Sequence, residues 1–390
     1  MLNIAYIGNF GFPDKNASGK RVLGNCKALL NFGYNVFCIG PGNENKYSYE
    51  GIVVYSINRG NEIERVLRSK LAIIENILEK ENIECIILYG AIFTEKENIK
   101  LIKWCHKKNI CVIYDQVDWL DLNWHNPIRA IIRAWNHKLI KNNIIPSCDG
   151  VICISSYLEN YYLKNNIDVL VVPPLALNKV DKISLDFNEK NIKLVYAGTT
   201  SDIRRPTSQW KDRIDIMFEM LYEVSKLESI KPFTLDIYGM TKERYLNMFP
   251  LKERNKGEMI IDKLRTRVIF HGNVSNSETM ARIKNADFTI LIRDKKRATM
   301  VGFPTKVSES ISCGTPVLCN DTSDIKNYIK NGKNGFVMND VKLMFIQALS
   351  LNKSDILEMK KSCCENPFFF EKYQKKLGEF IEKIIHKRRK

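Results

Sequence analysis

Lys306 and Glu309 are the residues whose types and spacing point most directly to chemistry. They lie three positions apart in the segment Gly302–Gly314, which also contains Pro304 and Thr305. Pro304 suits a helix entry, Thr305 suits a helix cap, and a closing glycine suits a helix end. The segment therefore predicts a loop, a short helix that begins near Thr305, and a following strand.

A lysine in the first helical turn opposes the helix dipole, which is unfavourable unless an anion also binds. The free amides of the helix start and Lys306 would together form a phosphate site. Glu309, one turn further on the same face, could accept hydrogen bonds from two neighbouring hydroxyls of a ribose. The alternative is that Lys306 and Glu309 form an ordinary exposed ion pair.

Two carboxylates, Asp115 and Asp118, follow a predicted buried strand. A carboxylate at such a place could orient an acceptor hydroxyl or take its proton, which makes both residues catalytic candidates. Alternatively, one aspartate caps a helix and the other is solvated. The chain contains no Asp-x-Asp pair, whose carboxylates would suit a hard divalent cation.

A glycine-containing loop follows the first predicted strand, with Gly8 and Gly11 at its start and Gly19 and Arg21 at its end. It is not the Gly-x-Gly-x-x-Gly of nicotinamide or flavin enzymes, and Gly40 stands near the position where their ribose-binding acid is expected. The sequence therefore disfavours a dehydrogenase.

Short β-branched runs that alternate with helical patterns predict α/β architecture with parallel sheets. We expect two Rossmann-like doubly wound domains that face a central cleft, over residues 1–175 and 192–365, with a linker at 176–191 and an amphipathic C-terminal helix within 366–390 that packs toward the first domain. The expected strands are Asn3–Ile7, Asn35–Ile39, Ile52–Ser56, Cys85–Tyr89, Cys111–Asp115, Val151–Ile154, Val169–Val172, Lys193–Ala197, Thr234–Tyr238, Val268–His271, Phe288–Ile292 and Pro316–Cys319.

Composition agrees with two globular domains and adds a question about charge. The 390 residues carry 60 basic and 44 acidic side chains, a net charge of +16, which predicts a polyanionic neighbour. The alternative is that AT-rich codon usage produces the excess of Lys. The 11 Cys are an odd number, and neither they nor the five His form a metal-ligand pattern. We expect no metal, no cofactor, and a cytoplasmic protein, because the first residues lack a signal peptide and no apolar run is long enough to span a membrane.

A basic amphipathic run at 127–141 could dock on anionic lipid, which would make the protein peripheral on the inner face of the membrane. Its basic residues are Arg129, Arg133, Lys138 and Lys141. Lys107, Lys108 and the tail Lys387–Lys390 could widen this face. A helix that packs on the core with a solvated basic side is the alternative.

The segment around Lys306 resembles the nucleotide-sugar motif of glycosyltransferase family 4, retaining enzymes of GT-B fold, in the variant Pro-x-Lys-x-x-Glu followed by Gly-x-Pro-Val. The resemblance extends over essentially the whole chain, because other landmarks follow in the family's order. These are the first glycine loop, the acids near residue 115, Ser155 and Ser156, Val171–Pro174, and Tyr196–Gly198.

The resemblance implies that Glu309 holds the donor ribose and that Lys306 and nearby amides face the donor phosphates. It also implies a phosphate cation after Gly198, for which Lys211 is favoured and Arg205 is second. The full set of expected donor-binding residues is Gly19, Arg21, Arg205, Lys211, Arg293, Gly302, Phe303, Pro304, Thr305, Lys306 and Glu309. One departure is Val301, which stands where relatives often carry an acid that contacts the donor sugar.

We therefore expect a metal-independent, retaining glycosyltransferase that moves a sugar from a nucleoside-diphosphate sugar to a saccharide or lipid-linked saccharide in surface polysaccharide synthesis. Two alternatives stay open. One is a basic nucleic-acid-binding protein, although no recognition helix, zinc module or aromatic RNA platform is present. The other is a sugar-nucleotide epimerase of the same fold. The sugar, the nucleotide base and the acceptor are not specified by the sequence.

Overall fold

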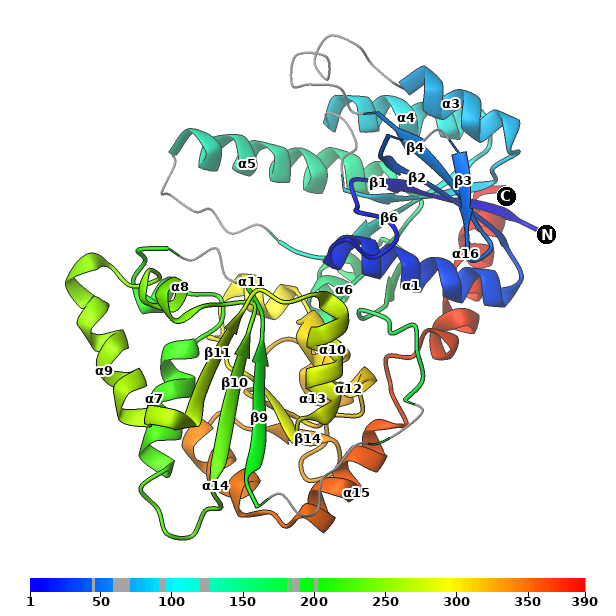
Figure 1. Cartoon of the computed structure of the whole chain (residues 1–390). Coiled ribbons are helices and arrows are strands. Elements are labelled where there is room, and N and C mark those ends of the chain that lie inside the picture. The colour runs from blue at the N-terminus through cyan, green and yellow to red at the C-terminus, as the bar shows by residue number, and fades with distance from the viewer. Residues whose placement is uncertain are drawn as a thin grey trace. The chain divides into compact units, whose positions relative to one another are not determined.

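The computed structural model describes residues 1–43, 46–58, 71–90, 95–119, 127–180, 183, 190–199 and 203–389. The chain divides into two compact units, each built on its own sheet (Figure 1). Unit 1 comprises Met1–Leu177, Val301–Phe303 and Phe369–Lys390, and unit 2 comprises Asn178–Met300 and Pro304–Phe368.

Unit 1 contains an eight-stranded sheet in the order β3-β4-β2-β1-β5-β6-β7-β8. All neighbours are parallel except the pair β3–β4. The strands are β1 (Asn3–Gly8), β2 (Asn35–Pro41), β3 (Lys46–Tyr49), β4 (Ile52–Ile57), β5 (Cys85–Tyr89), β6 (Cys111–Gln116), β7 (Gly150–Cys153) and β8 (Val169–Val171). The central strands are buried along almost their whole length, which is why their sequences read as continuous apolar runs.

Helices connect these strands as crossovers. They are α1 (Ala17–Phe32), α3 (Leu71–Lys80), α4 (Glu95–Lys107), α5 (Pro127–Leu139) and α6 (Ser156–Leu163). Helix α1 begins where the Asn16 side chain accepts a hydrogen bond from the Gly19 amide, at 2.9 Å, and ends at Gly33, whose φ of 106° is the left-handed conformation expected of a glycine stop.

The last helix, α16 (Gln374–Arg389), belongs to unit 1 and lies beside α1 although more than 340 residues separate them in sequence (Figure 1). Its apolar face, Leu377, Phe380, Ile381 and Ile384, is part of the unit 1 core. Gly378 permits the close approach, because a Cβ atom there would lie 2.2 Å from Cδ1 of Phe32.

Unit 2 contains a six-stranded, fully parallel sheet in the order β11-β10-β9-β12-β13-β14. The strands are β9 (Ile192–Ala197), β10 (Phe233–Tyr238), β11 (Val268–Gly272), β12 (Phe288–Leu291), β13 (Val317–Cys319) and β14 (Gly335–Val337). The helices are α7 (Ile214–Val224), α8 (Lys242–Leu246), α9 (Arg254–Leu264), α10 (Asn276–Asn285), α11 (Arg297–Val301), α12 (Thr305–Ser312), α13 (Ile325–Tyr328), α14 (Val341–Ser350) and α15 (Lys353–Cys363).

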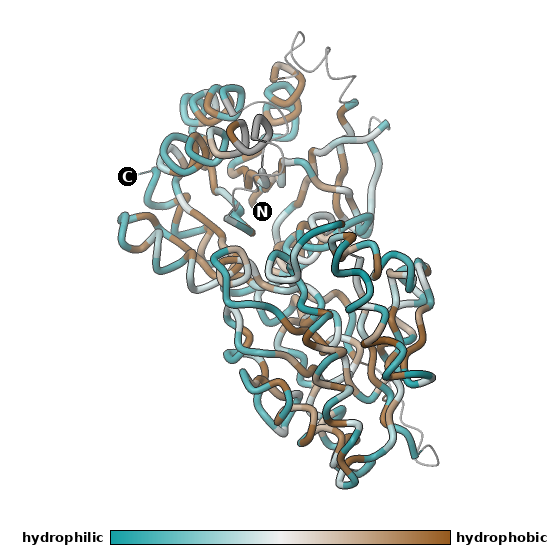
Figure 2. Tube along the Cα trace, turned by 90° about the vertical axis from the view of Figure 1, so that its left-hand side faces the viewer, coloured by the Kyte–Doolittle hydropathy of each residue, from teal (hydrophilic) through white to brown (hydrophobic). Residues whose placement is uncertain are grey.

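The helices carry apolar residues toward the sheets and polar residues outward, and their tubes alternate between the two colours in Figure 2. The predicted α/β class with two parallel-sheet, Rossmann-like domains and a C-terminal helix is confirmed. Two short strands were not predicted. β3 has the polar sequence KYSY at a sheet edge, and β14 has only three residues, so neither carries a strong strand pattern.

Candidate functional site

The candidate site of unit 2 lies at the carboxyl edge of its sheet, where several elements end or begin. β9 leads to Gly198, β12 leads to Arg293, and α12 starts at Thr305. Because all six strands are parallel, these residues come from the same edge. This edge is where open α/β sheets bind ligands.

Lys306 and Arg293 share a single carboxylate, that of Asp212. Arg293 Nε donates to Asp212 Oδ1 at 2.7 Å, and Lys306 Nζ forms an ion pair with Asp212 Oδ2. Tyr196 completes the cluster, since its hydroxyl donates to Asp212 Oδ2 at 2.8 Å and accepts from Lys306 Nζ at 3.0 Å. Lys306 Nζ also lies 4.3 Å from the centre of the Tyr196 ring.

This cluster carries one positive charge more than its carboxylate can balance. Arg293 and Asp212 are 8% and 9% exposed, so their charges are poorly screened by water. Burial alone would raise the pKa of Asp212, but Lys306 and Arg293 outweigh burial and hold that pKa well below its ordinary value. Burial lowers the pKa of Lys306; Asp212 opposes this shift, and Arg293 and Lys211 add to it. An added anion would relieve the repulsion between the two cations.

Gly198 leaves room for the lysine. A Cβ atom at Gly198 would lie 2.2 Å from Lys306 Nζ and 2.5 Å from its Cε. A residue with a side chain would therefore displace the ammonium group. The glycine that follows β9 allows the close approach that the cluster needs.

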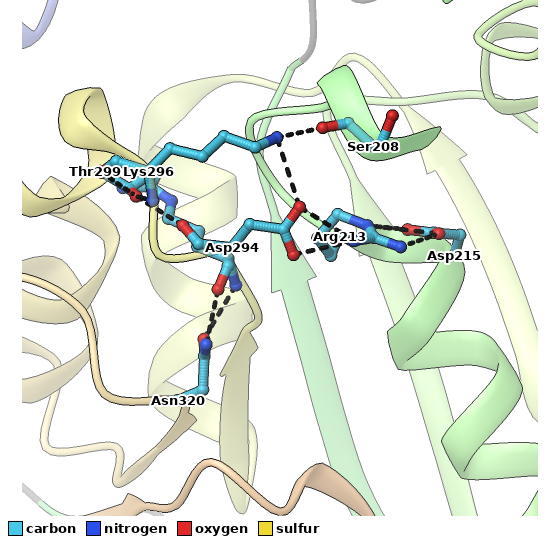
Figure 3. Close-up of polar contacts among 8 residues, drawn as sticks. Ser208, Arg213, Asp215, Asp294, Lys296, Thr299 and Asn320 are labelled. Atoms are coloured by element: carbon cyan, nitrogen blue, oxygen red, sulfur yellow. Dashed lines mark hydrogen bonds and ion pairs between the residues drawn. The ribbon is translucent and has the colours of Figure 1, made fainter. Parts of the chain in front are cut away.

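A second polar network, drawn in Figure 3, fixes the loops that carry Asp212 and Arg293. Arg213 pairs with Asp215 at 2.7 Å and with Asp294 at 2.8 Å. Lys296 pairs with the same Asp294 and donates to the Ser208 carbonyl. The Asn320 side chain accepts a hydrogen bond from the Arg293 amide and donates one to the Arg293 carbonyl. Because Asn320 directly follows β13, these bonds tie the start of the loop to the neighbouring strand.

The start of α12 differs in one detail from the prediction. Pro304 occupies the cap position, Thr305 is the first helical residue, and no side chain caps the helix within the described residues. The expectation that Thr305 caps the helix is therefore wrong, because the cap position is held by Pro304, whose side chain has no hydrogen-bond acceptor. The helix does begin at Thr305 as predicted, with Lys306 in its first turn, and half-buried Glu309 follows one turn later.

The other expected donor-binding residues fall at different places. Lys211 is exposed beside Asp212 and acts electrostatically on Lys306, whereas the loop with Arg205 is held through its backbone, by Met248 at 2.9 Å and Trp210 at 3.0 Å. Gly302 and Phe303 cluster with unit 1, not with the helix that follows them. The structure thus brings Lys306, Arg293 and Lys211 together, and leaves Arg205 outside the contacts that define the cluster.

In unit 1, Arg21 and Asp115 form a buried ion pair. They are 4% and 2% exposed, and Arg21 Nη2 lies 2.7 Å from Asp115 Oδ1. Arg21 also donates to the Val172 carbonyl at 2.9 Å, and Tyr6 donates to Asp115 at 2.5 Å. Burial first, and Asp115 next, raise the pKa of Tyr6.

These contacts engage Arg21 and Asp115 with each other inside unit 1, and the phosphate and acceptor contacts expected of them stay predictions. Gly19 is similarly engaged, because its amide binds Asn16 and its missing side chain lets the Gly11 carbonyl approach. Asp118, by contrast, is exposed just beyond the end of β6. Of the two acids proposed as catalytic, only Asp118 is accessible.

The basic segments expected at a membrane are partly neutralised within unit 1. Lys387, Arg388 and Arg389 pair with Asp168, Asp149 and Glu84 at 2.7, 2.7 and 2.9 Å, and Lys390 lies outside the described residues. Lys108 pairs with Glu79 at 2.7 Å, Lys141 stacks on the rings of Trp119 and Tyr161, and the side chains of Arg129 and Arg133 are not described. Residues 387–389 are thus paired with acids on the unit 1 surface, and their expected part in a membrane-docking face stays a prediction.

The part of the chain that the structure describes contains neither a helix suited to span a membrane nor a cluster suited to hold a metal. No helix there combines the length and hydrophobicity of a membrane span. No group of three or more His, Cys, Asp or Glu side chains is arranged to hold a metal ion in the same residues.

Comparisons with known proteins agree with this architecture. Residues 218–357 match the family model of glycosyl transferases group 1. Sucrose-phosphate synthase from Thermosynechococcus elongatus superposes with a TM-score of 0.67 at 13% identity, covering 99% of this chain and 100% of its own. HepE from Anabaena, solved in complex with UDP-glucose, gives a TM-score of 0.61 at 12% identity over 98% of this chain and 100% of its own.

A putative UDP-N-acetylglucosamine 2-epimerase from Listeria monocytogenes also superposes, with a TM-score of 0.56 at 13% identity over 99% of this chain and 98% of its own. No curated protein matches the sequence. The fold is thus that of the GT-B glycosyltransferases and related proteins, and the matched family segment contains Arg293, Lys306 and Glu309.

Sequence reasoning missed the residue at the centre of the cluster. The sequence predicts no role for Asp212, and Tyr196 is named only within the strand Lys193–Ala197 and the landmark Tyr196–Gly198. A buried pair of cations needs a carboxylate, so two predicted phosphate-binding cations could have prompted a search for one. The sequence contains no local pattern that selects Asp212, because Asp212 and Lys306 are 94 positions apart.

Proposed function

We propose that the protein is a metal-independent, retaining glycosyltransferase whose unit 2 binds a nucleoside-diphosphate sugar. The observation that carries this proposal is the pairing of Lys306 and Arg293 with one carboxylate at the carboxyl edge of a parallel sheet. The excess positive charge and the uncapped start of α12 suit a diphosphate. The family match over residues 218–357 supports the same assignment.

Each part of the site has a role in this proposal. Lys306, Arg293 and Lys211 would stabilise the charge that develops on the departing diphosphate, which is an electrostatic form of catalysis. Glu309 would accept hydrogen bonds from the ribose. No enzymic nucleophile is needed, because the acceptor would attack from the side of the leaving group. Asp118 would orient the acceptor hydroxyl or accept its proton.

The acceptor is proposed to be a saccharide or a lipid-linked saccharide used in surface polysaccharide synthesis. Helix α5 supports a membrane-bound acceptor, because Ile131 and Trp135, one turn apart, are each 61% exposed and Lys138 follows on an exposed position. Exposed apolar side chains with nearby lysines suit an anionic lipid surface. The protein would then act as a peripheral protein on the inner face of the membrane.

Co-sedimentation with vesicles tests this surface. Wild type should bind vesicles that contain anionic phosphatidylglycerol more than vesicles of phosphatidylcholine alone. Ile131→Ser with Trp135→Ser should reduce the binding, and the same two changes at exposed Leu251 and Met259 of unit 2 serve as control. Equal binding by both double variants would contradict membrane docking through α5.

The activity itself is tested with a panel of nucleoside-diphosphate sugars. Raised melting temperatures identify the donor, and turnover is then followed with and without lipid extracts or oligosaccharides as acceptors. Transfer with retained anomeric configuration supports the proposal. Interconversion of the nucleotide sugar without acceptor would favour the epimerase alternative instead, since a protein of that kind shares this fold.

A further inference from the structure

A groove of about 440 Å³ lies on one face of the unit 2 sheet, beside helix α10. Val195 and Tyr196 are neighbours in β9, so their side chains point to opposite faces of the sheet. Tyr196 belongs to the large core of unit 2, whereas Val195 packs with Ile283 and Ala286 of α10. The groove lies on the Val195 face, and none of the described residues that line it belongs to the cluster around Lys306.

Beyond α10, this face of the sheet is formed by β10 and the edge strand β11 (Figure 1). Asp236 of β10 is in register with Ile269 of β11, so both side chains lie on this face. Ile269 is 45% exposed, and His271, two residues further on, is exposed as well. Parallel sheets are normally covered on both faces, so this exposed stretch leaves room for a ligand.

Tyr238 supplies the observation that points to a ligand. It lines the groove and is only 4% exposed, yet its hydroxyl has no hydrogen-bond partner among the residues that the structure describes. Tyr245 also has an unpartnered hydroxyl, but that oxygen is sealed from solvent, whereas the Tyr238 hydroxyl is not. Burial first, and Asp236 next, raise the pKa of Tyr238, so the hydroxyl keeps its proton and can donate it to a ligand oxygen.

The acids that line the groove are already engaged. His271 stacks on the Tyr238 ring, with ring centres 4.4 Å apart and ring planes 7° apart, and its Nε2 lies 2.5 Å from Asp236 Oδ1. Asp287 pairs with Lys353 at 2.7 Å. Because both carboxylates have partners, they repel an anion less than free carboxylates would.

The groove carries more positive than negative charge. Against its two acids, the lining contains three cations, which are Lys193, Arg282 and Lys353. Arg282 pairs with Glu278 at 3.5 Å, but the two side chains are 56% and 45% exposed, so this pair contributes little and can open. The Arg282 guanidinium, the Asn285 amide and the tyrosine hydroxyl are hydrogen-bond donors of the kind that an oxyanion accepts from.

We propose that this groove binds a small oxyanion, a phosphate monoester or a carboxylate, through Tyr238, Arg282 and Asn285. Both groups present oxygens that accept hydrogen bonds from an arginine fork. The volume of the groove lies within the range of about 300 to 1,000 Å³ that small-molecule sites occupy. The site is separate from the one proposed for the donor diphosphate and does not depend on that assignment.

NMR of protein labelled at histidine reports on this groove. His271 is the one histidine in the sequence of unit 2, because His106, His125, His137 and His386 belong to unit 1 and serve as internal references. The His271 ring signal, assigned with His271→Gln, should shift in a saturable way with inorganic phosphate, glycerol 3-phosphate or succinate. A shift with the two phosphates alone identifies a phosphate site, and a shift with succinate alone identifies a carboxylate site.

Two variants remove the proposed contacts one at a time. Tyr238→Phe keeps the ring and removes only the hydroxyl, and Arg282→Gln removes an exposed charge. Each should weaken binding about tenfold, which corresponds to the loss of one hydrogen bond to a charged group. The matched controls are Tyr245→Phe, whose hydroxyl is sealed from solvent, and Lys256→Gln, an exposed cation on α9. Both should bind as wild type does.

Lys306→Met separates this site from the proposed diphosphate site and should leave the His271 shift unchanged. The inference is wrong if no probe shifts the His271 signal, if Tyr238→Phe and Arg282→Gln bind as wild type does, or if Lys306→Met abolishes the shift. A wild-type protein that shows the shift but binds no nucleoside diphosphate would contradict the proposed function and leave this oxyanion site in place.

Discussion

At the scale of residues, two buried ion clusters look alike but differ in their charge balance. In unit 1, Arg21 is matched by the single carboxylate of Asp115, so the charges balance and the pair is closed by Tyr6. In unit 2, one carboxylate serves both Arg293 and Lys306, so positive charge is left over. A balanced pair becomes costly only when one partner is removed, whereas a cluster with excess positive charge can accept an anion.

The two candidate catalytic acids differ in burial, because Asp115 is buried and Asp118 is exposed, and we therefore expect opposite results from their substitution. Asp115→Asn should destabilise unit 1 by about 3 to 5 kcal/mol, because Arg21 is left as an uncompensated buried charge. Asp118→Asn, at an exposed position, should change stability by less than about 0.5 kcal/mol while reducing transfer. Urea unfolding and turnover measure the two effects. An Asp118→Asn variant with full activity would remove that residue from the mechanism.

Gly198 gives a variant that moves Lys306 without removing it. In Gly198→Ala the new methyl group meets the far end of a flexible lysine side chain, which can swing away at small cost to folding. Affinity for nucleoside diphosphates should fall about tenfold, which corresponds to one charged hydrogen bond, while the melting temperature changes little. Calorimetric titration measures the affinity for the nucleoside diphosphate. Unchanged affinity would mean that the position of the Lys306 ammonium group does not affect nucleoside diphosphate binding.

Acid should weaken unit 2 through Asp212. Its folded-state pKa is held well below the ordinary Asp value of 3.8, so its stabilising contribution is complete above that value and is lost as the pH falls below it. The gap in unfolding free energy between wild type and Asp212→Asn should therefore narrow from pH 5 toward acid. Hydrogen exchange of unit 2 peptides at several pH values measures this gap. A gap that stays constant would contradict the ion cluster.

At the scale of elements, α16 completes the unit 1 core from the far end of the sequence. Gly378→Ala would place a methyl group 2.2 Å from the ring of Phe32, which cannot move freely because it also packs on Tyr34. We expect a loss of about 1 to 3 kcal/mol in unit 1, seen by urea unfolding. Lys375→Ala, an exposed residue on the same helix, is the control and should be neutral. Equal stabilities would argue against this packing.

The elements were largely predictable from the sequence, and the contacts between them were not. Buried parallel strands such as β1 and β6 are continuous apolar runs, and the Gly33 stop and the start of α12 follow from local preferences. The partners of Arg21, Lys306 and the C-terminal lysines lie 94 or more positions away in sequence. Only the folded topology brings such residues together.

At the scale of the whole molecule, the basic residues behind the net charge of +16 fall into several groups. The tail lysines and arginines of α16 form ion pairs with Asp149, Asp168 and Glu84, so part of the charge is paired within unit 1. Another part, around Lys306, is proposed to bind a diphosphate, and Lys138 beside Ile131 and Trp135 is proposed to meet lipid. Nucleic acid is not needed to account for these three groups.

The most direct test of the central claim is calorimetric titration of UDP, ADP and GDP into wild type, Lys306→Met and Lys353→Met. Lys353 is the matched control because it also forms a buried ion pair in unit 2, with Asp287 at 2.7 Å, but at the amino end of β12. At least one diphosphate should bind wild type and Lys353→Met equally, and Lys306→Met about ten- to a hundredfold more weakly. Equal affinity in Lys306→Met, or binding by none of the three proteins, would contradict the proposal that this cluster holds the donor diphosphate.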